Sequence, residues 1–255
     1  MEGTGLRTHE RRGLGVVGRR VVLPLLAMLA GTAPILRAQE PSIDTPYRWI
    51  EKGMRFGVSP GYILTSRGSL GLGPGSTPTA AGRFRLRVSN PLSFEVNLTY
   101  GNSDRHILNP FATGGPAVID TVNSSWLLAE AAIQFTFTGS RTWHGIQPYL
   151  VFGGGGLFGL GEEVSPLVEE LELERFVYEI GSAPSFLAAG GIEWLISRTV
   201  GLSFEVRDHI WRLKAPEGFF APEILEIILE SGAPAPNESE WTNNVEFSLS
   251  FWIYP

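Results

Sequence analysis

The sequence predicts an all-β fold, an eight-stranded antiparallel up-and-down β-barrel that spans a membrane. Apolar and polar residues alternate along eight segments, and long connections alternate with short ones. After residue 38, no apolar run is long enough for a membrane helix, although the apolar and glycine contents are high. Because only helices and closed sheets satisfy every backbone group in lipid, a barrel is the remaining way to cross a bilayer.

The first 38 residues have the layout of a cleaved secretory signal peptide. Five arginines precede an apolar run over residues 21–36, and a small residue, Ala38, lies at the predicted cut. We predict cleavage after Ala38, which would leave Gln39 at the new N-terminus. An anchor helix is the alternative, but two prolines and a glycine break the run, which is shorter than the roughly 20 apolar residues that a span needs.

Residues 39–53 are predicted to lead into a single barrel domain over residues 54–255. Without the six arginines and two glutamates of the signal peptide, 14 of the 20 basic and 24 of the 26 acidic residues remain, a net charge of −10. This charge disfavours nucleic acid as a partner. The chain has no cysteine, which excludes disulfides, thiolate metal sites and a lipoprotein anchor. We expect no cofactor and no bound metal.

Eight segments have the period-two alternation and about the length, roughly 9 to 11 residues, of a tilted membrane strand. They cover residues 54–66, 80–89, 92–102, 124–138, 146–157, 183–195, 199–213 and 241–253.

The connections between these segments differ in length by position. The odd-numbered connections are long and cover residues 67–79, 103–123, 158–182 and 214–240. The even-numbered ones are short and cover residues 90–91, 139–145 and 196–198. Short periplasmic turns and long outer loops are typical of outer-membrane barrels.

The polar face of these strands carries charges of both signs, as where Arg85 lies between Phe84 and Leu86. A lipocalin-like soluble barrel alternates as well, but with its apolar side chains inside. We assign the charged face to the lumen. The predicted lumen charges are Arg55, Arg83, Arg85, Arg87, Arg207, Glu95, Glu130, Glu193, Glu205 and Glu246.

An eight-stranded barrel is only wide enough for side chains to fill its interior. The lumen charges are therefore predicted to form an ion-pair network that plugs the barrel. The alternative is a gated ion path or a catalytic carboxylate.

The seven tryptophans fall near the ends of the predicted strands and predict two girdles at the membrane interfaces. They are Trp49, Trp126, Trp143, Trp194, Trp211, Trp241 and Trp252. Strict alternation would instead turn Trp126, Trp211 and Trp252 inward.

Two segments of the outer connections are predicted to form short helices. Residues 167–174 follow Ser165 as the cap and Pro166 in the first turn, and residues 221–230 end before Gly232. Their leucine and isoleucine residues would pack over the barrel mouth or against a partner. Their glutamates could attract divalent cations but have no defined ligand spacing.

Over residues 47–255 the chain resembles the OmpA- and OmpX-like family of outer-membrane β-barrels. The resemblance rests on Phe56-Gly57-Val58-Ser59-Pro60-Gly61-Tyr62, on Pro148-Tyr149 before Gly153 to Gly156, on Leu202-Ser203-Phe204-Glu205-Val206-Arg207-Asp208, and on the terminal aromatic residues Phe247, Phe251 and Trp252. It implies a monomer in the bacterial outer membrane, in contact with lipid and lipopolysaccharide, that the barrel-assembly machinery inserts.

We expect a non-enzymatic barrel with a structural or surface-interaction role. A lipid-modifying enzyme of the lipid A deacylase kind is one alternative, and a narrow channel or carrier for a small ligand is another. A deacylase needs a serine, a histidine and a carboxylate that are aligned. The nearest candidates are Asp208, His209 and Ser203, but adjacent residues of a strand point to opposite faces.

Overall fold

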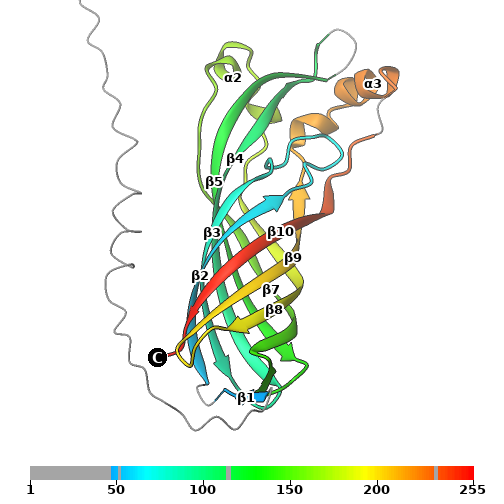
Figure 1. The fold of residues 1–255 in the computed structure, drawn as a ribbon. Helices are drawn as coiled ribbons and strands as arrows, with labels where there is room; N and C mark the ends of the chain where they lie inside the picture. The colour runs from blue at the N-terminus through cyan, green and yellow to red at the C-terminus, as the bar shows by residue number, and fades with distance from the viewer. Residues whose placement is uncertain (1–46, 51–52, 113–115, 233–234) are drawn as a thin grey trace, which may run out of the picture. The chain divides into compact units, whose positions relative to one another are not determined.

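Eight long strands form a closed antiparallel barrel (Figure 1). Each pairs with its neighbours along the chain, and the last strand pairs with the first, which closes the sheet. The strands are β2 (Met54–Leu64), β3 (Thr77–Arg87), β4 (Leu92–Asn109), β5 (Ala117–Thr136), β7 (Ile146–Glu162), β8 (Ser182–Leu195), β9 (Val200–Lys214) and β10 (Ser239–Ile253). The predicted fold class, an eight-stranded up-and-down barrel, is confirmed.

The computed structural model describes residues 47–50, 53–112, 116–232 and 235–255. The predicted signal peptide lies outside these residues, as does most of the lead-in. No helix among the described residues is both long and apolar enough to cross a membrane.

The two ends of the barrel differ in their connections. One end, here the long-loop end, carries the connections that follow β2, β4, β7 and β9, and the other is the short-turn end. At the short-turn end, β1 (Tyr47–Trp49) pairs with β6 (Arg141–Trp143). At the long-loop end lie α2 (Pro166–Glu170), η1 (Glu174–Phe176), η2 (Glu217–Phe220) and α3 (Pro222–Glu230).

The two helices predicted in the long loops are present. The Ser165 hydroxyl caps α2 by accepting a hydrogen bond from the Leu167 backbone N–H at 3.3 Å. Helix α3 begins at Pro222 and is followed by Gly232, which has a φ of 78°. The segment 167–174 is helical over a shorter stretch than predicted, since α2 ends at Glu170 and residues 174–176 form η1.

The connection predicted over residues 103–123 is mostly strand. β4 and β5 stay paired from Ser103 opposite Ser124 to Asn109 opposite Ala117, with one register shift after Ile107. The prediction was wrong because it stopped each strand at the length of a membrane span. The residues beyond that length continue the antiparallel ladder past the rest of the barrel wall (Figure 1).

The barrel wall alternates between inward and outward residues as the period of two requires. On β3, Arg83 and Arg85 are buried, whereas Leu86 is exposed on the outside. The strand register places Arg85 directly opposite Glu95 of β4. On β7 the backbone bends so close to β5 that a Cβ atom at Gly155 would overlap the Ala129 carbonyl oxygen.

Candidate functional site

The middle of the lumen holds a central cluster of five buried charges: Arg83, Arg85, Glu95, Glu205 and Arg207. Glu95 bridges two arginines, with its Oε2 atom 2.5 Å from Arg85 Nη2 and its Oε1 atom 2.6 Å from Arg207 Nη2. Glu205 Oε1 lies 2.8 Å from both Arg83 Nη1 and Arg207 Nη2. These contacts tie β3, β4 and β9 together across the interior.

Towards the long-loop end, a histidine joins two carboxylates. His209 Nδ1 lies 2.9 Å from Glu130 Oε1, and its Nε2 lies 3.1 Å from Glu246 Oε2. Thr79 donates a hydrogen bond to the other oxygen of Glu246 at 2.5 Å. The ring therefore links β5, β9 and β10. Sequence reasoning placed His209 on the lumen side but left it out of the network, although it continues the inward series of Glu205 and Arg207.

Towards the short-turn end, the Glu193 carboxylate of β8 contacts three side chains, those of Arg55, Arg85 and Tyr254. Its Oε2 atom lies 3.3 Å from Arg55 Nη2 and 3.2 Å from Arg85 Nη1. The Tyr254 hydroxyl donates a hydrogen bond to its Oε1 atom. The Arg85 guanidinium also lies over the Trp252 ring, 4.2 Å from the ring centroid. Arg85 thus connects this group with the central cluster.

Nine of the ten predicted lumen charges take part in these contacts. Arg87 is the exception and is corrected. It is only partly buried, and its Nη1 atom donates to the Ile50 carbonyl at 2.7 Å. As the last inward residue of β3, it lies at the short-turn end, where backbone rather than a network carboxylate is within reach.

The arrangement favours a packed plug over a wet pore. The side chains of Arg83, Glu205 and Arg207 are fully inaccessible to solvent. A buried unpaired charge costs several kcal/mol, whereas a charge that keeps its partners and hydrogen bonds is tolerated. The cluster pairs each of its cations with a carboxylate, which is the condition for holding so many charges in a narrow barrel.

Between the polar interior and the long loops lies an apolar cap, which sequence reasoning did not identify as a layer of the lumen. Trp126 and Trp211 are fully buried, with ring centroids 6.2 Å apart, and the Trp126 N–H donates to Ser103 Oγ at 3.2 Å. The cap comprises Ile63, Leu72, Ile107, Leu108, Val122, Trp126, Leu128, Leu157, Val168, Leu173, Phe176, Tyr178, Ile180, Trp211, Leu213, Phe219, Ile224 and Ile228.

Helices α2 and α3 contribute Val168, Ile224 and Ile228 to this cap, so the loop helices do pack on the barrel. The Arg105 guanidinium, which donates to the Tyr178 carbonyl and pairs with Glu162 at 2.9 Å, holds the connection before β8 in place. Burial raises the pKa of the Tyr178 phenol, which therefore stays neutral in the cap.

The seven tryptophans predicted to form the girdles divide into two groups. Trp49, Trp143, Trp194 and Trp241 are 51–62% exposed on the outside. Trp126, Trp211 and Trp252 have no exposed surface and lie inside the barrel, so their assignment to a girdle was wrong. Their sequence positions put them on the inward face. Glycine leaves the space for two of them, because a Cβ atom at Gly101 would overlap the Trp126 ring and one at Gly57 would overlap the Trp252 ring.

The three candidate deacylase residues do not come together as a triad. His209 is buried between two glutamates, and Ser203 Oγ instead accepts a hydrogen bond from Trp252 Nε1 at 2.8 Å. Asp208 points to the other face of β9 and accepts from the Asn244 N–H at 3.1 Å. Within the described part of the chain, no group of three or more His, Asp or Glu side chains is arranged to hold a metal ion.

The fold and the interior define the class: a closed eight-stranded antiparallel barrel with a polar, ion-paired lumen. No protein-family model and no curated protein sequence matches the chain. Among solved structures it is similar to the outer membrane protein OprG from Pseudomonas aeruginosa, with 10% identity, a TM-score of 0.49 and coverage of 79% of this chain and 96% of OprG.

Two further similar structures are Neisserial surface protein A and the outer membrane enzyme PagL. The first has 12% identity and a TM-score of 0.43, and the match covers 83% of this chain and 98% of the other. PagL has 14% identity and a TM-score of 0.36, with 77% and 98% covered. These proteins are eight-stranded outer-membrane barrels of the OmpA/OmpX-like kind. The architecture of the present chain rests on its own strand pairing.

Proposed function

We propose that this chain is an integral barrel of the bacterial outer membrane, non-enzymatic and plugged, with a structural or surface-interaction role. The observation that carries the proposal is the orientation of the two faces of the wall. Outward residues such as Phe56, Phe152 and Leu249 are 49–56% exposed, while Arg85, Glu95 and Glu205 are buried inside. A water-soluble barrel would have the opposite arrangement, because exposed apolar bands of this extent favour contact with lipid.

Four outward tryptophans support the same placement. Trp49, Trp143 and Trp194 lie near the short-turn end and Trp241 near the long-loop end, as amphipathic rings do at membrane interfaces. The Arg141 guanidinium lies 4.7 Å from the Trp49 ring centroid, an amphipathic pair suited to that depth. On this proposal the short-turn end faces the periplasm and the long-loop end faces outward.

The proposal includes the route to the membrane. A signal peptide over residues 1–38 would be cleaved to leave Gln39, and the barrel-assembly machinery would insert the chain through its aromatic last strand, which ends with Phe251 and Trp252. The inserted monomer would contact lipid and lipopolysaccharide.

Membrane fractionation combined with gel electrophoresis tests the placement. The full chain should sediment with the outer membrane and resist extraction by carbonate. It should also migrate differently in detergent gels before and after boiling, because the closed hydrogen-bonded sheet of a barrel resists unfolding in detergent until it is heated. Mass spectrometry of the same material should give a chain that begins at Gln39. Recovery in the aqueous periplasmic fraction with no heat-dependent shift would contradict the proposal.

If the lumen is plugged, the barrel should not conduct ions. The purified barrel added to a planar bilayer should give no unitary conductance steps, because the central cluster and the apolar cap fill the interior with paired charges and packed rings. A 16-stranded porin, whose barrel encloses an aqueous channel, serves as the positive comparison. Stable unitary steps from the unaltered chain would favour a narrow channel over a plugged barrel.

A further inference from the structure

The barrel wall opens at one seam near the long-loop end. The ladder between β8 and β9 stops at Ser185 opposite Trp211. Both strands continue, because β8 still pairs with β7 at Ser182 and β9 still pairs with β10 at Lys214. Between their unpaired ends lies a cleft of about 480 Å³. This volume is within the range of small-ligand sites, roughly 300 to 1,000 Å³.

The seam cleft is lined by charges of both signs. Arg212 and Lys214 of β9 provide two cations, and Glu179, Glu217 and Glu238 of the surrounding loops provide three carboxylates. The remaining lining is small and mixed in polarity. It consists of Val177, Tyr178, Gly181, Ser182, Ala183, Pro184, Ala215, Pro216 and Ser239.

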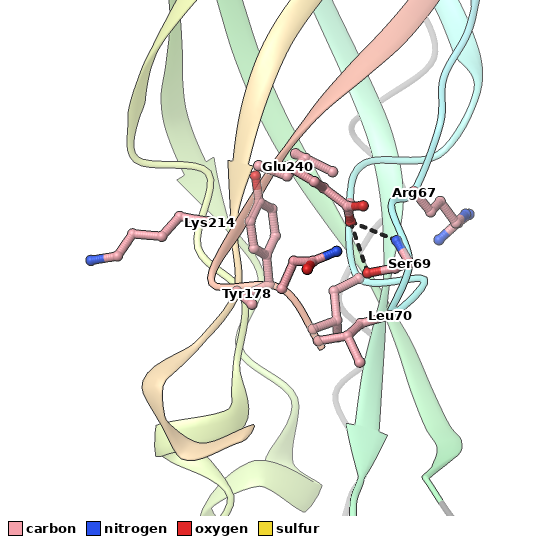
Figure 2. Close-up of a pocket in the computed structure, with 11 residues that line it drawn as sticks. Arg67, Ser69, Leu70, Tyr178, Lys214 and Glu240 are labelled. Atoms are coloured by element: carbon pink, nitrogen blue, oxygen red, sulfur yellow. Dashed lines mark hydrogen bonds between the residues drawn. The ribbon is translucent and has the colours of Figure 1, made fainter. Parts of the chain in front are cut away.

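The Lys214 ammonium is available to a ligand. Figure 2 shows its side chain extending away from Glu240, whose carboxylate instead accepts hydrogen bonds from the Ser69 backbone N–H at 2.6 Å and the Ser69 hydroxyl at 3.2 Å. Among the described residues Lys214 forms no ion pair, and its side chain is exposed. Arg212 uses one N–H to contact Ser239 Oγ at 2.5 Å, which leaves further donors of its fork free to face the cleft.

Next to the cleft, the outward side chains of the barrel wall change from apolar to charged. Immediately towards the short-turn end, Phe186 and Trp241 form an outward pair with ring centroids 5.6 Å apart, and each is more than half exposed. On β9, the outward residues run from Phe204 and Val206 through Asp208 and Ile210 to the cations Arg212 and Lys214. A molecule in the cleft would therefore meet apolar surface on one side and charges on the other.

We propose that the seam cleft binds the headgroup of a membrane lipid that carries both a phosphate and an ammonium group. The phosphate would contact Lys214 and Arg212, the ammonium would face the carboxylates, and the acyl chains would lie on the Phe186 and Trp241 rings. A purely anionic headgroup fits less well, because three carboxylates line the same cleft. A headgroup without charge would leave both cations unpaired. The proposal rests on the membrane placement above.

Native mass spectrometry of the full mature chain in non-ionic detergent tests this proposal. The probe is dihexanoyl phosphatidylethanolamine, and dihexanoyl phosphatidylglycerol and dihexanoylglycerol serve as anionic and neutral comparators. The zwitterionic lipid should bind at least tenfold more tightly than either comparator. Lys214→Gln should weaken its binding about tenfold, because a charge-assisted contact to phosphate is lost. Ser182→Trp, which fills the cleft with a bulky side chain, should abolish it.

Arg141→Gln is the matched control, since it removes one outward cation at the opposite end of the barrel and should leave binding unchanged. A heat-dependent gel shift for every variant shows that each one has folded. Equal losses for Lys214→Gln and Arg141→Gln, or equal binding of all three lipids by a heat-modifiable barrel, would overturn the lipid site alone. A chain that is soluble without detergent and shows no heat shift would instead overturn the membrane placement.

Discussion

Replacing Glu95 with alanine should lower the free energy of unfolding by about 3–5 kcal/mol. Glu95 accepts from Arg85 and Arg207 at once, with both ion pairs fully buried. Its loss would leave two guanidinium groups in the lumen without their shared carboxylate, and the neighbouring Glu205 carboxylate already serves Arg83 and Arg207. Urea unfolding of the barrel in detergent micelles, followed by tryptophan fluorescence, measures the change.

Two further variants separate the ion-pair contribution from the loss of a side chain. Glu95→Gln keeps the shape and some hydrogen bonds, so it should fall between the alanine variant and the unaltered chain. Glu230→Ala removes an exposed glutamate at the end of α3 and should change the free energy by less than about 0.5 kcal/mol. An unchanged unfolding midpoint for Glu95→Ala would show that the central cluster contributes nothing to the stability of the fold.

Replacing Trp126 with alanine should cost about 3–5 kcal/mol, the range for a large buried aromatic residue. Trp126 is fully buried beside Trp211 and donates to Ser103, so its removal leaves a cavity in the apolar cap and an unpaired hydroxyl. The same unfolding titration reports it. Because the cap also holds α3 through Ile224 and Ile228, proteolysis of the long loops should become faster.

Trp241→Ala is the matched tryptophan control. The Trp241 side chain is 51% exposed on the outer wall, so its loss should cost less than about 1.5 kcal/mol. Equal losses at the two positions would mean that Trp126 is not packed in a closed cap.

The eight strands and their faces could be predicted because the barrel obeys one local rule along its whole length. In β3 the period of two alone separates Arg83 and Arg85 from Phe84 and Leu86, and in β9 it separates Glu205 and Arg207 from Phe204. Seven of the eight strand pairings join neighbours along the chain, so only the closing pair of β10 with β2 is a long-range contact. The nine charges that meet in the lumen follow from the same rule.

The errors arose where the period of two was set aside for a rule of composition. Tryptophan favours interfaces on average, but Trp126, Trp211 and Trp252 follow the alternation and turn inward. His209 follows it as well and joins Glu130 and Glu246 in the network.

Other features depend on contacts that no local pattern carries. The apolar cap joins residues of α2 and α3 to β5 and β9, far apart in the chain. The extension of β4 and β5 depends on the pairing of polar residues such as Asp104 and Asn123, which lie opposite each other in the register. Arg87 lies outside the network because it is at the short-turn end of the barrel, where it contacts the Ile50 carbonyl. The seam cleft exists because β8 and β9 are unpaired before Ser185 and beyond Trp211, which a sequence of alternating residues does not indicate.

The orientation of the two faces is the central claim, and the absence of cysteine makes it directly measurable. Single cysteines at positions 203 to 206 of β9 and 247 to 250 of β10 can carry a spin label in lipid vesicles. Collision rates with oxygen, which concentrates in the hydrocarbon, should be high at Phe204, Val206, Phe247 and Leu249 and low at the residues between them. The reverse alternation, with high rates at Ser203, Glu205, Ser248 and Ser250, would contradict the account.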